Sequence, residues 1–269
     1  MTDAKSSPVA KPIRAPFDLS WPGAFAMLQR NRDVYLKTWK TNFLPPLLEP
    51  LLYLLSLGYG LGHYVQSIDG VSYARFVAPG ILAITMMQSA FFETTYGSYV
   101  RMWFQKTWEA VTATPLSLDD VLVGELLWAA TKSTINCVLM ALVVGLFGLL
   151  PWGAIPAIAL VAFLAGLLFG GIGLAVSAKV PTIDAFQFSI YLFVTPMMLF
   201  AGTFFPLHQL PHWSQAVAYA LPLTHAVLAT RILASGTLAG LLPSLAYLAA
   251  GAIIAPAIAI ALMKRRLAM

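Results

Sequence analysis

Three ionisable residues lie inside strongly apolar segments, where a charge costs free energy and commonly marks a functional or packing site. They are Glu49, Glu93 and Lys132. Glu49 and Lys132 are expected at similar depths, so a carboxylate–ammonium pair could fix the packing of two helices, or the long side chains could reach the interface. Glu93 is equally compatible with a packing role and with a transport pathway. A proton relay would need more carboxylates than these segments provide.

The histidines offer a second kind of chemistry, because His208 and His212 stand four residues apart and His225 follows nearby. On one helix, that spacing can place two imidazoles on the same metal ion. However, Pro206 and Pro211 interrupt the segment, and no nearby cysteine or carboxylate completes a ligand set. Solvated or interface histidines are therefore the favoured interpretation, and no metal site is expected.

The composition indicates a polytopic, all-α membrane protein. Of 269 residues, 59% are hydrophobic and 10% are charged, whereas soluble domains carry about 25% charge. The net charge of +5 comes from Lys and Arg at the ends of apolar segments, so a nucleic-acid partner is not expected. There is no GxxxxGK[ST] motif, so we expect neither nucleotide hydrolysis nor a bound cofactor in this chain. The single cysteine, Cys137, excludes an internal disulfide.

The chain divides into three parts. Residues 1–18 are rich in Lys, Ser and Pro and are expected to be disordered. Residues 19–41 contain an amphipathic helical pattern over 21–40, which we expect to lie at the membrane surface with its basic side chains toward lipid head groups. Docking of this helix on the protein itself is the alternative. The remaining part, 42–269, is expected to form six spans, near 43–64, 76–99, 121–149, 154–178, 183–201 and 242–263.

The distribution of Lys and Arg predicts the orientation. Basic residues concentrate near the N-terminus, in the loop that follows the second span, and at the C-terminus. The positive-inside rule therefore places both termini in the cytoplasm of a bacterial cell, with the chain in the inner membrane. The segment 202–240 would then face outward, with short helices at 213–221 and 224–233 that dip part way into the membrane.

The stretch 101–128 is the longest polar interruption between two apolar segments. A short helix over 107–113 is predicted within it, because Pro115 disfavours helical geometry in the preceding residue. Ser117, followed by Asp119 and Asp120, predicts the start of the next helix. A short helix held between two spans suits contact with another protein, although a solvated loop would explain the same pattern.

Four glycines, Gly166, Gly170, Gly171 and Gly173, fall in the fourth predicted span. Small residues in a membrane helix let neighbouring helices approach closely, so we expect these glycines to serve helix packing.

Several motifs resemble those of type-2 ATP-binding-cassette exporter permeases. The stretches 92–96 (FETTY), 105–110 (QKTWEA) and 124–132 (GELLWAATK) are similar to the NodJ-like branch, which exports lipooligosaccharide nodulation factors. The outward segment resembles a signature of the wider family, although Ala201 stands where serine often precedes the glycine. That signature comprises Gly202, Pro206, Pro222, His225 and Arg231.

The resemblance implies a homodimer in which each protomer binds one copy of a separate ATPase subunit, and that subunit holds ATP and Mg²⁺. The helix 107–113 would be the coupling helix, braced by the helix 21–40. Trp108 would be an anchor in the ATPase groove, and Glu109 would pair with a basic residue on its rim. The ATPase-coupling residues would be Thr107, Trp108, Glu109, Ala110 and Val111.

The resemblance also implies a central cavity lined by the first, second and fifth spans. Candidate pathway residues there are Phe91, Phe92, Glu93, Phe193, Met197 and Met198. Ordinary packing or lipid contact explains each of them equally well. The branch suggests an amphiphile with a sugar head and an acyl tail, whereas the wider family also exports hydrophobic drugs and lipid-linked polysaccharides. The alternatives are an ion-coupled secondary transporter, which should show an internal repeat, and an intramembrane metal-dependent enzyme.

Overall fold

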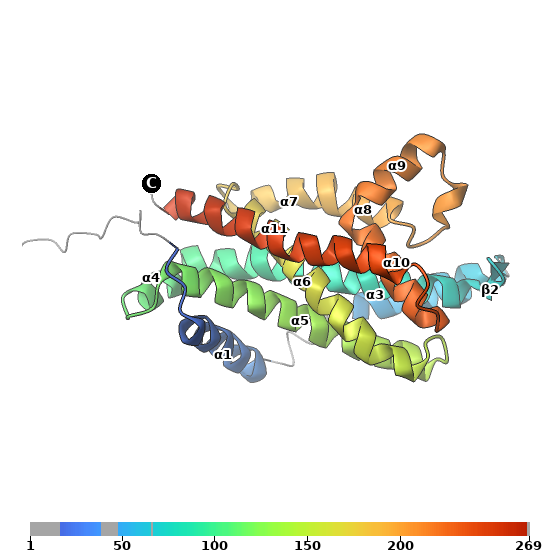
Figure 1. Ribbon diagram of the computed structural model, residues 1–269, viewed down its shortest axis with the longest axis horizontal. Helices are drawn as coiled ribbons and strands as arrows, with labels where there is room; N and C mark the ends of the chain where they lie inside the picture. The colour runs from blue at the N-terminus through green and yellow to red at the C-terminus, as the bar shows by residue number, and fades with distance from the viewer. Residues whose placement is uncertain (1–16, 39–47, 66, 268–269) are drawn as a thin grey trace, which may run out of the picture.

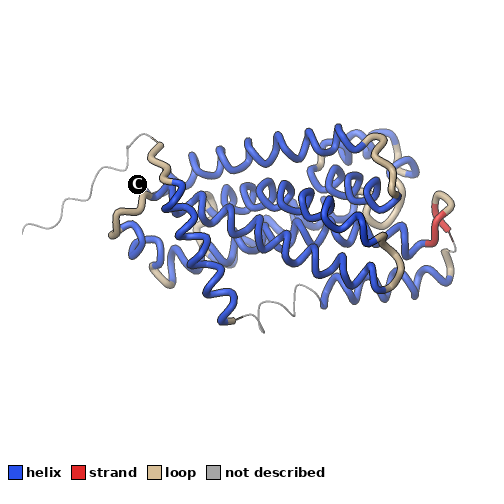
Figure 2. The backbone as a smooth tube through the Cα atoms, turned by 60° about the horizontal axis from the view of Figure 1, so that its bottom comes forward, coloured by secondary structure: helices blue, strands red, loops and turns tan. Residues whose placement is uncertain are grey.

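The computed structural model describes residues 17–38, 48–65 and 67–267 (Figure 1). Its long helices run side by side along the long axis of the molecule, which confirms the predicted all-α architecture (Figures 1 and 2). A small antiparallel hairpin of β1 (Ser67–Ile68) and β2 (Val71–Ser72) lies at one end. The C-terminus and the short helix α4 (Thr107–Thr112) lie at the other. We call these the hairpin end and the α4 end.

Five helical segments in the described ranges are long and apolar enough to cross a membrane, and they match the second to sixth predicted spans. Their bounds are Tyr73–Phe104, Leu118–Leu146, Trp152–Ser177, Ile183–Phe200 and Leu241–Leu267. Part of the first predicted span, 43–47, lies outside the described residues, as does nearly all of the predicted tail. The rest of that span is helical over 48–63 and includes the π-helical η1 (Leu54–Gly60) and the short η2 (Leu61–His63).

The second span is longer than predicted. α3 (Tyr73–Phe92) continues without a loop through two π-helical turns, η3 (Glu93–Gly97) and η4 (Val100–Phe104). Arg101 therefore lies inside a helix rather than in the polar loop where the sequence placed it. Single π-turns inside helices occur often at functional sites.

The remaining helices complete the bundle. α5 (Leu118–Leu146) and α6 (Ile155–Ser177, preceded by η5, Trp152–Ala154) pack against α3. α11 (Leu241–Leu267) packs along α6. The fifth span is built from four short pieces, η6 (Ile183–Ala185), α7 (Phe186–Ser189), η7 (Ile190–Val194) and α8 (Thr195–Phe200).

The segment before the last helix folds at the hairpin end. It contains η8 (Leu207–Gln209), α9 (His212–Ala220) and α10 (Pro222–Ser235), so both predicted short helices are present. α9 and α10 are bent by 87° relative to each other, and they would make a sixth membrane-crossing unit only if taken together. α10 starts with Pro222, whose fixed φ suits a first helical position, and ends before Gly236 at φ +75°.

α1 (Trp21–Lys37) docks on the protein itself, along α5. Its buried face consists of Gly23, Ala24, Met27 and Asn31. Trp21 points away from the bundle with 68% of its surface exposed. The small face permits a close approach, since a Cβ at Gly124 of α5 would lie 2.6 Å from Met27 Cβ. The docking alternative is therefore correct for the buried face of α1, and the exposed aromatic face remains available to lipid.

Hydrogen bonds pin the start of α1 to the start of α5. α5 starts at the predicted place, and Ser117 and Asp120 form a reciprocal capping box there. Asp120 Oδ1 also accepts a hydrogen bond from the Ser20 backbone N–H at 2.6 Å. Asp119 Oδ2 accepts from Lys264 Nζ of α11 at 2.8 Å. The beginnings of α1 and α5 and the end of α11 therefore form one fixed junction near α4.

The glycines of α6 allow the close packing that the sequence predicted. A Cβ at Gly173 would lie 2.8 Å from the Phe91 backbone oxygen, and one at Gly171 would lie 2.6 Å from the α11 backbone at Pro256. These close approaches on both sides place α6 between α3 and α11.

Candidate functional site

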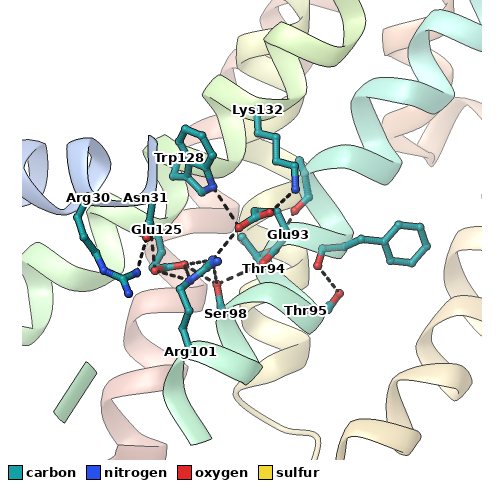
Figure 3. Close-up of polar contacts among 12 residues, drawn as sticks. Arg30, Asn31, Glu93, Thr94, Thr95, Ser98, Arg101, Glu125, Trp128 and Lys132 are labelled. Atoms are coloured by element: carbon teal, nitrogen blue, oxygen red, sulfur yellow. Dashed lines mark hydrogen bonds and ion pairs between the residues drawn. The ribbon is translucent and has the colours of Figure 1, made fainter. Parts of the chain in front are cut away.

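Two acidic and two basic side chains, from η3, η4 and α5, meet inside the bundle (Figure 3). Arg101 Nη2 lies 2.8 Å from Glu93 Oε1 and 2.5 Å from Glu125 Oε2. Lys132 Nζ lies 2.6 Å from Glu93 Oε2. Glu125 is fully buried, and the other three side chains expose 16% or less. We call Glu93, Arg101, Glu125 and Lys132 the charged cluster.

Neutral donors complete the coordination of the carboxylates. Trp128 Nε1 donates to Glu93 Oε1 at 3.1 Å, and Ser98 Oγ donates to Glu125 Oε2 at 2.7 Å. Asn31 Nδ2 of α1 donates to Glu125 Oε1 at 3.1 Å. Because each buried carboxylate has a cation and additional donors, the cost of burying its charge is offset.

Helical spacing brings these residues together. Glu125, Trp128 and Lys132 occupy positions i, i+3 and i+7 of α5, which form one face of a helix. On the opposing helix, Glu93 and Arg101 are separated by eight residues, and the π-turns η3 and η4 carry both of them. Both π-turns therefore contribute a charge to the cluster.

The predicted pair of Glu49 with Lys132 is wrong. Lys132 instead pairs with Glu93, because η3 and α5 are in contact and the two side chains face each other there. Glu49 is exposed and lines a cleft beside the cluster. The sequence had left Glu93 open between packing and a pathway; it is held in an ion pair and also faces this cleft.

The cleft has a volume of about 580 Å³ and lies between α1, the start of the first span, α3 and α5. Glu93, Arg101 and Lys132 of the charged cluster form one part of its wall, and neutral polar side chains form another. Clefts of this size are typical of small-molecule sites in proteins.

Arg30 of α1 also faces the cleft, which corrects the prediction that the basic residues of this helix all turn toward lipid head groups. Its guanidinium donates to Asn31 Oδ1 at 2.9 Å and lies 3.4 Å from Thr107 Oγ1. Burial and the positive charge of Arg101 lower the pKa of Arg30 from its ordinary value, while Glu125 acts in the opposite direction. Arg30 thus links the cluster, α1 and α4.

α4 matches the predicted short helix, but not all of the five residues expected to contact an ATPase subunit are exposed on it. Trp108 is 3% exposed and packs in the core of this chain, so it is not free to enter a groove on another protein. Thr107 is also buried, and Val111 is half-buried. Glu109 pairs with Lys106 at 2.8 Å, and Ala110 is exposed.

The six pathway candidates separate into three pairs. Phe91 and Met197 are 1% exposed and belong to the hydrophobic core, so neither can offer its surface to a passing ligand in this conformation. Phe193 and Met198 are half-buried and pack against that core. The last two candidates, Phe92 and Glu93, line the cleft.

The histidines do not converge. His208 lies 4.0 Å from Asp69 and is largely exposed, and His212 is exposed at the start of α9. His225 instead stacks on Tyr247, with ring centroids 3.9 Å apart. Within the described parts of the chain, no group of three His, Cys, Asp or Glu residues is placed to hold a metal ion.

The structure explains two residues of the family signature in the segment 202–240, namely Arg231 and Gly202. Arg231 Nη2 donates to the Gly202 carbonyl at 2.9 Å and to the Phe76 carbonyl at 3.3 Å, and its guanidinium lies over the Phe76 ring. Gly202 has φ +75°, a backbone conformation that glycine adopts at little cost. Pro206 precedes η8 as the signature turns back toward α9.

Comparison with known proteins identifies the class. Residues 23–234 match the ABC-2 type transporter family, and this chain belongs to that family. It is therefore a multi-pass membrane permease component of an ABC transporter, which confirms the resemblance seen in the motifs.

The chain is similar to Nodulation protein J of Rhizobium leguminosarum bv. viciae, with 39% identity over 78% of this chain and 80% of that protein. Identity to Nodulation protein J of Rhizobium meliloti (strain 1021) is 38%, over 75% and 77% respectively. A more distant relative is the Inner membrane transport permease YadH of Escherichia coli (strain K12), 20% identical over 78% and 81%.

Proposed function

We propose that this chain is the permease of an exporter that moves an amphiphile out of the inner leaflet, driven by ATP hydrolysis on a separate subunit. The working unit is a homodimer with two ATPase copies, which bind ATP and Mg²⁺. The chain lies in the bacterial inner membrane with the α4 end and both termini at the cytoplasmic side. The similarity to Nodulation protein J supports a lipid-linked or lipooligosaccharide-like cargo.

The observation that carries this proposal is that α4 has one face packed in the bundle and the other exposed. The buried Trp108 fixes one face of α4 in the bundle, while Glu109 and Ala110 present the other face outward. α4 follows η4 after a tight turn in which Lys106 has φ 54°. A displacement of α4 by a protein bound to its exposed face would therefore also displace η4 and Arg101 of the charged cluster.

The energetic requirement is that the ATPase pair favours one permease conformation when ATP is bound. The charged cluster can respond to this shift, because Arg101 contacts two carboxylates on different helices. A displacement of η4 would redistribute Arg101 between Glu93 and Glu125 without leaving either carboxylate in an apolar environment.

The test compares two identical substitutions at exposed alanines. Ala110→Trp places a large side chain on the exposed face of α4, whereas Ala216→Trp places the same side chain on α9 at the hairpin end. Both chains are reconstituted in nanodiscs and titrated with the cognate ATPase subunit. We expect Ala110→Trp to weaken the complex by at least about tenfold, equivalent to about 1.4 kcal/mol, and Ala216→Trp to bind like wild type. Equal affinity for all three chains would refute the assignment of α4.

A further inference from the structure

The cleft beside the charged cluster extends far into the membrane-crossing part of the chain. Its wall includes Thr85, Gln88, Glu93 and Arg101 on one continuous helical segment. Sixteen residues separate Thr85 from Arg101, which corresponds to roughly 24 Å at 1.5 Å per residue. A polar wall of this length inside a membrane is expensive and is usually retained for a function.

The middle of the cleft offers neutral hydrogen-bonding groups. Gln88 Nε2 lies 3.9 Å from Met198 Sδ, a weak acceptor, so its amide retains most of its capacity for a ligand. Asn136 donates to Ser89 Oγ at 2.9 Å, and Asn136, Ser89 and Thr85 all line the same cleft. Amides and hydroxyls of this kind can both donate to and accept from a ligand hydroxyl.

The charges around the cleft are balanced. Three cations, Arg30, Arg101 and Lys132, face it, and so do two carboxylates, Glu49 and Glu93. The third carboxylate of the site, Glu125, lies directly behind and binds Arg101, so that three positive and three negative charges cancel. A ligand carrying a net charge would therefore meet no excess of opposite charge and would also lose its hydration.

Apolar surface accompanies these polar groups. Phe92 and Tyr96 line the cleft together, with ring centroids 6.1 Å apart, and Val34 of α1 and Val100 of η4 add aliphatic surface. Aromatic faces beside neutral amides suit a ring that carries hydroxyl groups along its edge and C–H groups on its face.

We propose that this cleft binds the uncharged, hydroxyl-rich head group of an amphiphile within a single protomer, as a glycoside head group would be bound. The proposal builds on the proposed function in taking the ligand to be the amphiphilic cargo, but binding itself requires neither the ATPase nor a second protomer.

The experiment uses the full chain in phosphatidylcholine nanodiscs without ATPase. The probe is dodecyl maltoside that carries a photoreactive diazirine on its head group, and labelled peptides are mapped by mass spectrometry. We expect labelling at the cleft-lining parts of α1, α3 and α5. Unlabelled dodecyl maltoside should compete at least about tenfold better than dodecyl phosphate or dodecyltrimethylammonium, the ratio expected when a desolvated charge lacks a partner.

Gln88→Leu should reduce cleft labelling about five- to tenfold, the effect of one or two hydrogen bonds. The matched control is Gln187→Leu on α7, an exposed glutamine outside the cleft, which should label like wild type. Gln88→Lys adds a cation and should shift the competition toward dodecyl phosphate, a gain that misfolding cannot imitate.

Three results would overturn the proposal: even labelling of all membrane-facing helices, equal labelling of Gln88→Leu and Gln187→Leu, or equal competition by the charged amphiphiles. Failure of the cleft is separable from failure of the exporter assignment, because the ATPase titration does not involve the probe. A chain that binds the ATPase but does not label would refute only the cleft.

Discussion

Replacing Arg101 should lower the free energy of unfolding more than replacing any other residue of the charged cluster. Arg101→Met takes away the guanidinium shared by Glu93 and Glu125, at 2.8 and 2.5 Å. Glu93 keeps Lys132, but the fully buried Glu125 is left with neutral donors only. Breaking a buried ion pair on one side typically costs about 3–5 kcal/mol, because a charge remains unpaired. We expect that loss in the free energy of unfolding.

Two further variants calibrate the magnitude. Lys132→Met leaves Glu93 with Arg101 and the Trp128 N–H, so it should cost only about 1–3 kcal/mol. Lys106→Met breaks a pair whose side chains are 55% and 68% exposed, and it should stay within about 0.5 kcal/mol of wild type.

The assay is reversible unfolding in mixed lipid–detergent micelles, followed by tryptophan fluorescence. The double variant Arg101→Met with Glu125→Leu should recover most of the lost stability, since both members of the pair are replaced by apolar groups. If Arg101→Met unfolds no more readily than Lys106→Met, or if the double variant is less stable than the single one, the interpretation of the cluster is wrong.

Three more outcomes follow from backbone packing and capping. Gly173→Ala should lower the thermal midpoint clearly in a thermal scan, because its Cβ would lie 2.8 Å from an α3 backbone oxygen, whereas Gly153→Ala, with open space around it, should not. Gly202→Ala and Gly236→Ala both strain a backbone at φ +75°, but only the Cβ at position 202 would also meet a side chain of η8, at 2.8 Å. Gly202→Ala should therefore have a lower expression level and a lower thermal midpoint than Gly236→Ala. Asp120→Ala removes a capping box and a bond to the residue before α1, so it should cost about 1–2 kcal/mol and speed amide exchange at the start of α1.

Much of the architecture could be predicted because hydropathy sets the length of a span and proline or a capping residue sets its ends. The start of α5 at Ser117 and the break before α10 at Pro222 are local signals of this type. The end of the second span at Phe104 was missed, because a charged residue such as Arg101 resembles the edge of a span unless its partner is known.

The charged cluster was less predictable than the spans, because the sequence does not show which charged residues become partners. The side chains of Glu125 and Lys132 lie seven residues apart on one face of α5, and this pattern could have suggested a polar helix face. Which carboxylate meets Lys132 depends on how α3 packs against α5, and that information is non-local. Trp108 shows a related difficulty, since an aromatic residue in a short polar helix is equally suited to an interface and to the chain's own core.

We propose above all that ATP hydrolysis on a partner subunit drives movement of the membrane bundle through α4. The most direct measurement is the rate at which a fluorescent lipooligosaccharide-like amphiphile moves out of the ATPase-bearing leaflet in proteoliposomes that contain both subunits. We expect movement that requires ATP, is lost with Ala110→Trp, and is retained with Ala216→Trp. Movement driven by an ion gradient without the ATPase, or equal rates for the two tryptophan variants, would contradict it.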